Sequence, residues 1–441
     1  MAALVLFLSF ASTFFILSAL TREVRASWVK TTIIYAILIA LLTEGLSISQ
    51  SLVLAPILSF WIGALAVNIA LVIYLYKSNH LLGSQFYLGK FKASLGERQL
   101  SVYVFWAIAS VLFITLATAL IAPPDNWDSM TYHMSRVMHW MQNRSVEHYP
   151  THILRQVSLP PGAGYLVMHL QFLAGGDYLA NLVQWLAYFG CILVTTLIVQ
   201  RLIGSDQQEY EWLGGLITAS IPMAILQSTT TQTDLAVSYW LVCFLYFIIR
   251  TNTYKRSDLI WIGLTLGLAI LTKPTAYVFG LPTFCLFLLR LIKDKLPSFK
   301  TKIANFTVFA TLTLAIPLPY FLRNYQLFSN PVGTDYSTRN EIFGVVPFLS
   351  NLVRLIAINL PFQPWSALEW LHSNLLQIDI NDPRITHSDI TLYQENFLYI
   401  APLKILPVAS PIYSSRPLAF MLLAKRTYLR IKIREIKGIS F

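Results

Sequence analysis

The chain is built around long apolar runs that short polar stretches separate. A bilayer has a hydrocarbon core about 30 Å thick, which a helix of about 20 apolar residues can cross. Runs of this length or slightly shorter cover residues 1–20, 31–48, 52–76, 102–122, 178–200, 213–228, 235–249, 258–271, 274–292 and 303–322. Backbone groups in lipid must be bonded within the protein, and this favours helices. The sequence therefore predicts an all-α polytopic membrane protein with about 10–11 transmembrane helices.

Composition and charge agree with a membrane protein. Charged residues make up 12% of the 441 positions, against about 25% in soluble chains, which argues against a disordered chain, a coiled coil or a disulfide scaffold. In a soluble protein the net charge of +11 would suggest a nucleic-acid partner. Here the basic residues lie mainly in short loops and the C-terminal tail, so the excess indicates membrane topology and contact with membrane lipid, and we expect no nucleic-acid partner.

Four basic loops set the orientation. The positive-inside rule places in the cytoplasm the loops that contain Arg22, Arg25 and Lys30; Lys77, Lys90, Lys92 and Arg98; Arg250, Lys255 and Arg256; and Lys293, Lys295, Lys300 and Lys302. An even number of spans must separate two cytoplasmic loops, so the apolar piece 165–174 is predicted to lie at the interface rather than to cross. Residues 123–177 then form a long outer loop. Asp234, Lys273 and Arg323 lie in shorter pieces on the same side.

The first outer loop holds the densest group of titratable side chains. If the chain is helical after Asp128, three- and four-residue spacing predicts one polar face and one apolar face. The polar face would carry Asp128, Tyr132, Ser135, Arg136 and His139, and the other face Met134, Val137, Met138 and Met141. Asp128 would lie in the first turn, where the helix dipole favours a negative charge. Two interpretations are open: Asp128 caps a surface helix, or it is a catalytic carboxylate.

The other outer pieces also allow two interpretations each. Asp234 is a second outer carboxylate or the cap of the next helix. Lys273 is a phosphate ligand or an anchor at the interface. Arg323 is suited to bidentate contact with phosphate, or it simply lies at the end of a helix. A divalent metal ion is a further candidate: no His pair has the spacing of a zinc helix motif, but Asp128, His133 and Asp234 could share an ion.

Taken in order, these motifs resemble the GT-C superfamily of integral-membrane glycosyltransferases. The similarity is to the family 39-like group that includes protein O-mannosyltransferases and lipid A aminoarabinose transferases. It covers roughly residues 102–335, and its motifs are Asp128 to His133, Pro160-Pro161-Gly162-Ala163-Gly164-Tyr165, Thr231-Gln232-Thr233-Asp234, Thr272-Lys273-Pro274, and Arg323-Asn324 with Asn330-Pro331. By this resemblance the chain divides into N-terminal spans with a cytoplasmic loop (1–101), a GT-C-like core (102–335) and an atypical C-terminal region (336–441).

The resemblance implies transfer of a hexosyl or pentosyl group from a polyprenyl-phosphate donor to an acceptor at the outer face of the bacterial plasma (inner) membrane. Asp128 is then the catalytic base, because an attacking hydroxyl loses a proton whereas a leaving phosphate needs no strong acid. Lys273 and Arg323 are assigned to the phosphate, and Asp234 to a metal or the acceptor. The remaining substrate-binding candidates are Tyr132, His133, Arg136 and Asn324. The acceptor is a protein, a lipid or a glycan.

Two departures from the family pattern stand out. Many relatives carry an acidic pair in the first outer loop, but Ser129 follows Asp128, so Asp125 is the second carboxylate or there is none. The C-terminal region has an amphipathic run at 345–360, a proline-broken apolar segment at 397–413 and a basic tail. A cytoplasmic tail requires one more crossing between residues 397 and 424, and a truncated relative is one interpretation of this region.

Other function classes fit the sequence less well. A polymerase or ligase of lipid-linked glycans would normally have its large loop between late spans, whereas here the large loop comes early. A transporter would show internal repeats and polar breaks in paired spans, which the sequence lacks. A non-enzymatic scaffold would leave the crowding of acidic, basic and His residues in one loop unexplained.

Overall fold

A computed structural model describes residues 2–80, 83, 85–89, 99–204, 208–293, 298–333, 341–358, 365–380, 382 and 384–385. These residues form helices and contain no strand, which confirms the predicted all-α fold. The chain divides into two compact units, Met1–Asp335 and Tyr336–Phe441. In the second unit, α17 (Val345–Ile358) lies on the predicted amphipathic run and is followed by α18 (Trp365–Trp370) and the π-helical turn η3 (Leu371–Leu376). The predicted crossing between 397 and 424 falls outside the described residues.

The first unit is a bundle of apolar helices, and the protein is an integral multi-pass membrane protein. Within the described residues, six helices are long and apolar enough to span a membrane: α1 (Ala2–Thr21), α2 (Val24–Ile48), α3 (Leu54–Lys77), α5 (Gln99–Ile121), α9 (Leu182–Ile203) and α14 (Thr275–Lys293). A further three have 17 residues each: α12 (Asp234–Arg250), α13 (Arg256–Thr272) and α15 (Phe299–Ala315). By length and composition the structure thus gives fewer spans than the predicted 10–11, and the higher count stays a prediction.

Prolines break two of the predicted runs. The run 213–228 becomes α10 (Gln208–Ala219) and α11 (Pro222–Gln227). The run 303–322 becomes α15 and α16 (Leu318–Phe328), which meet at Pro317 with a bend of 57°. Proline has no backbone N–H and disfavours a helical conformation in the residue before it. Because of this bend, the axis of α16 departs from that of α15, and the polar side chains of α16 do not continue along the α15 axis.

Glycines allow close approach between the central helices. A Cβ at Gly190 of α9 would lie 2.4 Å from the Tyr239 ring of α12. A Cβ at Gly263 or Gly267 of α13 would lie 2.9 Å or 3.0 Å from a backbone oxygen of α15. In a bilayer the hydrophobic effect does not drive helices together, because lipid tails are as apolar as the side chains. Close van der Waals packing at small residues stabilises the contact between helices instead. This packing holds α9, α12, α13 and α15 together.

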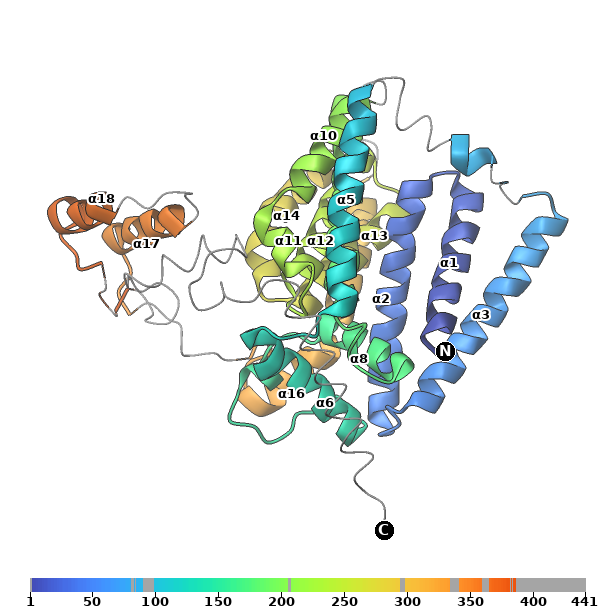
Figure 1. Ribbon diagram of the computed structural model, residues 1–441, viewed down its shortest axis with the longest axis horizontal. Coiled ribbons are helices and arrows are strands. Elements are labelled where there is room, and N and C mark those ends of the chain that lie inside the picture. The colour runs from blue at the N-terminus through green and yellow to red at the C-terminus, as the bar shows by residue number, and fades with distance from the viewer. Residues whose placement is uncertain are drawn as a thin grey trace, which may run out of the picture. The chain divides into compact units, whose positions relative to one another are not determined.

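Polar loops gather at one end of the bundle. At the end where α5 finishes lie α6 (Met134–Asn143), α8 (Gly162–Ala174) and α16 (Figure 1). We call this the loop end. The helix α8 has 13 residues, about 20 Å, which is shorter than the hydrocarbon core, as predicted for a piece that does not cross. The opposite end holds basic residues in ion pairs: Arg25 with Glu211 and Arg250 with Glu23, both at 2.7 Å.

Candidate functional site

The segment after Asp128 is helical but begins with an irregular turn. Residues Ser129–His133 form the π-helical turn η1, and the Ser135 hydroxyl donates to the carbonyl of Met130, five residues earlier. The wider turn shifts the helical register relative to a regular α-helix. Arg136 is only 1% exposed and Met138 is 53% exposed, so the predicted polar face is not the exposed face at these two residues.

The Asp128 side chain is free of a capping role. The backbone N–H of Ser129 donates to Oδ1 of Asn126 at 2.8 Å, and Asp128 makes no side-chain capping bond. Instead its Oδ2 accepts from the Gln232 amide at 3.2 Å, and the carboxylate is half-exposed. The interpretation of Asp128 as a helix cap is therefore wrong. The other first-loop carboxylate, Asp125, is exposed.

Three segments of the loop end meet around Asp128. The Thr231 hydroxyl donates to the hydroxyl of Ser129 at 2.6 Å, which fixes the Gln232 loop against η1. Asp234, at the start of α12, pairs with Lys273 at 2.5 Å, and both side chains are partly exposed. Lys273 is thus an ion-pair partner rather than an isolated anchor. We call Asp128, Tyr132, His133, Gln232, Asp234 and Lys273 the Asp128 cluster.

Burial keeps two members of this cluster uncharged. It raises the pKa of Tyr132, and the nearby charges of Asp128 and Asp234 raise it further. Burial also lowers the pKa of His133 to about 3, with the charges of Arg136 and Lys273 acting in the same direction. At neutral pH, Tyr132 is therefore a phenol and His133 a neutral imidazole. An imidazole with so low a pKa is a weak base, so His133 is a poor proton acceptor. Asp128 presents a half-exposed carboxylate instead.

The low pKa of His133 predicts a stability that depends on pH. The unfolded chain binds a proton at His133 near pH 6.5 and the folded chain does not, so stability falls as pH drops from 6.5 towards 3. We expect His133 to lower the free energy of unfolding by about 2 kcal/mol at pH 5 relative to neutral pH. His133→Gln should remove that part of the loss of unfolding free energy between pH 7 and 5, measured by thermal or denaturant unfolding. His80→Gln, at an exposed His, should leave it unchanged, and equal acid sensitivity of the His133→Gln and native proteins would contradict the prediction.

A second group surrounds Arg323. Its guanidinium forms two bonds to the Glu44 carboxylate, at 2.6 and 2.8 Å, and Arg323 is 8% exposed. The Tyr165 hydroxyl bonds both partners, at 2.5 Å to Glu44 and 2.9 Å to Arg323. In the sequence, Glu44 is a charged residue inside the apolar run 31–48. Such a charge is itself a signal, because an ionisable residue in a span is costly and usually has a partner.

Asn324 is also engaged within the protein. Its amide nitrogen donates to the carbonyl of Ser158 at 3.1 Å, its Oδ1 lies 3.1 Å from Nε2 of His148, and the residue is fully buried. Burial and the charge of Arg323 lower the pKa of His148. We call Glu44, His148, Tyr165, Arg323 and Asn324 the Arg323 cluster. Substrate binding by Arg323 and Asn324 stays a prediction.

Arg136 holds the turn that precedes α8. Its guanidinium donates to the carbonyls of Leu159 and Pro160, at 2.8 and 3.3 Å, and lies 4.9 Å from the centre of the Trp140 ring. The following Gly162 is needed for close approach, because a Cβ there would lie 2.9 Å from the carbonyl oxygen of Leu271. The Pro-Pro-Gly motif thus places the start of α8 against the end of α13, beside Lys273. Substrate binding by Arg136 stays a prediction.

Apart from Arg136 and Asp125, which lie outside both, the predicted catalytic and substrate-binding residues fall into the Asp128 cluster and the Arg323 cluster. Lys273 and Arg323 pair with different carboxylates, Asp234 and Glu44. The described residues also contain no group of three His, Cys, Asp or Glu side chains suited to a metal ion. Asp128, His133 and Asp234 are thus not gathered as a set of metal ligands, and metal dependence stays a prediction.

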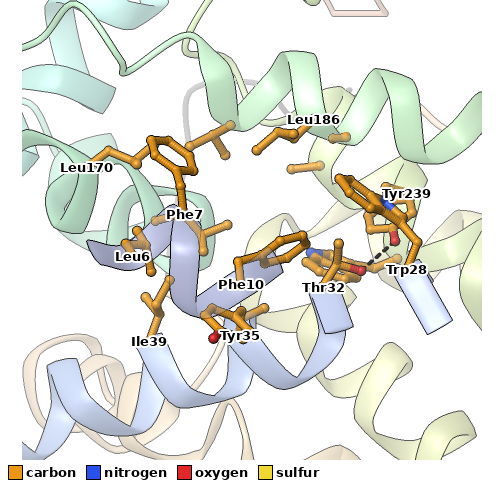
Figure 2. Close-up of a pocket in the computed structure, with 16 residues that line it drawn as sticks. Leu6, Phe7, Phe10, Trp28, Thr32, Tyr35, Ile39, Leu170, Leu186 and Tyr239 are labelled. Atoms are coloured by element: carbon orange, nitrogen blue, oxygen red, sulfur yellow. Dashed lines mark hydrogen bonds between the residues drawn. The ribbon is translucent and has the colours of Figure 1, made fainter. Parts of the chain in front are cut away.

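An apolar cavity of about 200 Å³ lies among the helices (Figure 2). It is lined from α1, α2, α8, α9 and α12 by side chains that include Leu6, Phe7, Phe10, Trp28, Tyr35, Ile39, Leu170 and Leu186. The hydroxyls of Thr32 and Tyr239 bond each other at 2.6 Å and so satisfy one another. The lining on α12 begins at Ala236, within one helical turn of Asp234. The cavity wall therefore starts at nearly the same level along the axis of α12 as Asp234, which does not itself line the cavity.

Comparison with family models gives a match over part of the chain. Residues 158–321 match the family model of the dolichyl-phosphate-mannose-protein mannosyltransferases. This confirms the resemblance to GT-C glycosyltransferases and supports a membrane glycosyltransferase that uses a lipid-linked sugar donor. The matched segment contains Asp234 and Lys273 but ends before Arg323 and begins after Asp128. Neither the comparison with curated proteins nor that with solved structures gives a match.

Proposed function

We propose that the chain transfers a hexosyl or pentosyl group from a polyprenyl-phosphate donor to an acceptor at the outer face of the bacterial plasma membrane. The observation that carries the proposal is the Asp128 cluster. A half-exposed carboxylate is held by an amide of the Gln232 loop, and the same loop leads to Asp234 and its partner Lys273. A proton acceptor and a cation at one site are what transfer from a phosphate ester requires.

In the proposed reaction Asp128 takes the proton of the acceptor hydroxyl as its oxygen attacks the anomeric carbon. The bond between that carbon and the donor phosphate oxygen breaks, and the phosphate leaves with the bonding electrons. Lys273 stabilises the added negative charge, because its ammonium group can donate hydrogen bonds to Asp234 and to the phosphate at the same time. Tyr132 and His133, both uncharged, donate or accept hydrogen bonds to the sugar.

The lipid part of the donor also has a suitable place. The apolar cavity lies among the bundle helices, and its α12 wall starts near Asp234. A donor with its phosphate at Lys273 can extend its isoprenoid chain along α12 into this cavity. Few polar groups line it: the Thr32 and Tyr239 hydroxyls bond each other, and the ring nitrogen of Trp28 has no hydrogen-bond partner. An isoprenoid chain there would therefore break no hydrogen bond of the lining.

Chain-length dependence tests this proposal. Purified protein in liposomes should release polyprenyl phosphate from a polyprenyl-phosphate sugar when a membrane extract supplies acceptors, and should ignore a nucleotide sugar. Leu186→Trp narrows the cavity, so we expect about a tenfold or larger rise in KM for a long-chain donor and little change for a donor with two isoprene units. Ile69→Trp, at an exposed position on α3, is the matched control. Equal use of both donors by the Leu186→Trp protein would exclude this cavity as the binding site of the isoprenoid chain. Absence of any lipid-donor use by the native protein would reject the proposed function.

The outer location of the loop end predicts its accessibility. The exposed residues Glu147 and His80, substituted singly by Cys in a protein with Cys285→Ala, should differ in whole cells. A membrane-impermeant thiol reagent should label position 147 and spare position 80, because the basic loops fix the cytoplasmic side. Labelling should become equal after the membrane is permeabilised. The opposite pattern would place the Asp128 cluster in the cytoplasm and reject the proposed reaction site.

A further inference from the structure

A small cavity at the loop end lies between two arginines. It has a volume of about 10 Å³, and its lining includes Arg136, Arg323, His148, Gln156 and Tyr320. A space of this size holds about one water-sized atom. Polar and apolar side chains share its lining, whereas the larger cavity of Figure 2 is almost entirely apolar.

Arg136 carries a buried charge that its protein partners do not neutralise. Its two terminal nitrogens bond only the backbone carbonyls of Leu159 and Pro160, and its Nε has no partner although the residue is 99% buried. Within the described residues it forms no ion pair with a carboxylate. A buried cation without an opposite charge is strongly unfavourable, so this site is expected to attract an anion.

The other groups at the cavity do not supply the missing charge. Arg323 is already neutralised by Glu44, through two hydrogen bonds. His148 lies in a surrounding that disfavours its protonated form, because burial and Arg323 lower its pKa. The lining is therefore left with one positive charge in excess. The Tyr320 hydroxyl and the Gln156 amide donate to backbone carbonyls, whereas the Nε of Arg136 is a donor without a partner. An anion at this site would accept from that Nε–H.

We infer that this cavity is an oxyanion subsite, in which one oxygen of a phosphate or carboxylate group inserts between Arg136 and Arg323. It is distinct from the Lys273–Asp234 pair, which has a cation of its own. Its role in transfer rests on the proposed function: the oxyanion is either the donor phosphate or an anionic group of the acceptor. Because Lys273 already serves the donor phosphate in that proposal, we expect the acceptor to supply the anion.

Thermal unfolding of the full chain in detergent tests the subsite. Inorganic phosphate should raise the Tm by about 2 °C or more over chloride at equal ionic strength, because a ligand of the folded state stabilises it. His148→Glu places a carboxylate in the lining and should abolish this shift, whereas the neutral His148→Gln should keep it. Gln156→Glu supplies the same charge from a second residue of the lining, in case His148→Glu does not fold. No phosphate shift in the native protein, or an undiminished shift in a folded carboxylate variant, would overturn the inference.

A second arm identifies the source of the oxyanion. With undecaprenyl phosphate already saturating, inorganic phosphate should raise the Tm further if the subsite serves the acceptor, and should not if the donor phosphate fills it. The binding inference and the proposed function can fail separately. Loss of lipid-donor use with a retained phosphate shift would reject the function alone, whereas normal transfer without any phosphate shift would reject the subsite alone.

Discussion

Asp128→Asn should reduce sugar transfer by about 100-fold or more while the protein keeps its fold. Asparagine has nearly the size of aspartate and can still accept a hydrogen bond from the Gln232 amide, which lies 3.2 Å from the native carboxylate. It cannot take the proton of the acceptor hydroxyl. The loss should appear in kcat with little change in KM for the donor, because the proton moves only as the acceptor attacks. Steady-state assays over a range of concentrations of a polyprenyl-phosphate sugar measure both.

Two features of the loop make this test clean. Asn126, not Asp128, caps the turn that follows, so Asp128→Asn removes no capping bond. Asp125→Asn is the matched control, because Asp125 is exposed and lies three residues earlier in the same loop. We expect it to retain transfer. Near-normal transfer by the Asp128→Asn protein, or a comparable loss in the Asp125→Asn protein, would remove Asp128 from its proposed role.

Glu44→Gln should destabilise the folded protein by about 3–5 kcal/mol, the cost typical of removing one partner of a buried ion pair. Arg323 would keep its charge with only 9% of its side chain exposed, and it would lose two short hydrogen bonds to a carboxylate. The Tyr165 hydroxyl would lose a charged acceptor as well. Thermal unfolding of the purified protein, followed through its many tryptophans, measures the change.

The double variant separates the pair from its members. Glu44→Gln with Arg323→Gln removes both charges, so we expect a smaller loss than Arg323→Gln or Glu44→Gln alone gives. Glu23→Gln, at a half-exposed ion pair with Arg250, should cost about 1 kcal/mol or less. If Glu44→Gln were as mild as Glu23→Gln, the Glu44–Arg323 pair would not hold the loop end together.

Apolar length was enough to locate most helices from sequence. Each of the ten predicted runs overlaps a described helix, and the basic loops correctly separate the two ends of the bundle. The same rule kept α8 from being counted as a span. The length of an apolar run does not reveal the breaks at Pro222 and Pro317, because these depend on where the prolines lie within the run.

The site was harder to predict because its pairings are far apart in the chain. Asp234 and Lys273 were both singled out, but that they bond each other depends on how α12 and α13 pack. Glu44 pairs with Arg323 across 279 positions, which local spacing cannot reveal. The burial of Arg136 depends on distant partners in the same way, because its guanidinium bonds the carbonyls of Leu159 and Pro160, 23 and 24 positions later.

The pairing of Glu44 with Arg323 has a consequence for how the protein is made. A ribosome adds about 5–20 residues per second, so Glu44 enters the membrane region about 15–55 s before Arg323 has been synthesised. During that interval the carboxylate lacks the partner that it has in the finished protein. The first helices must therefore stay free to adjust until α16 emerges, and the loop end closes only when the chain from both sides has arrived. Assembly of this end is thus a late event of biogenesis, set by the order of synthesis rather than by the strength of any one contact.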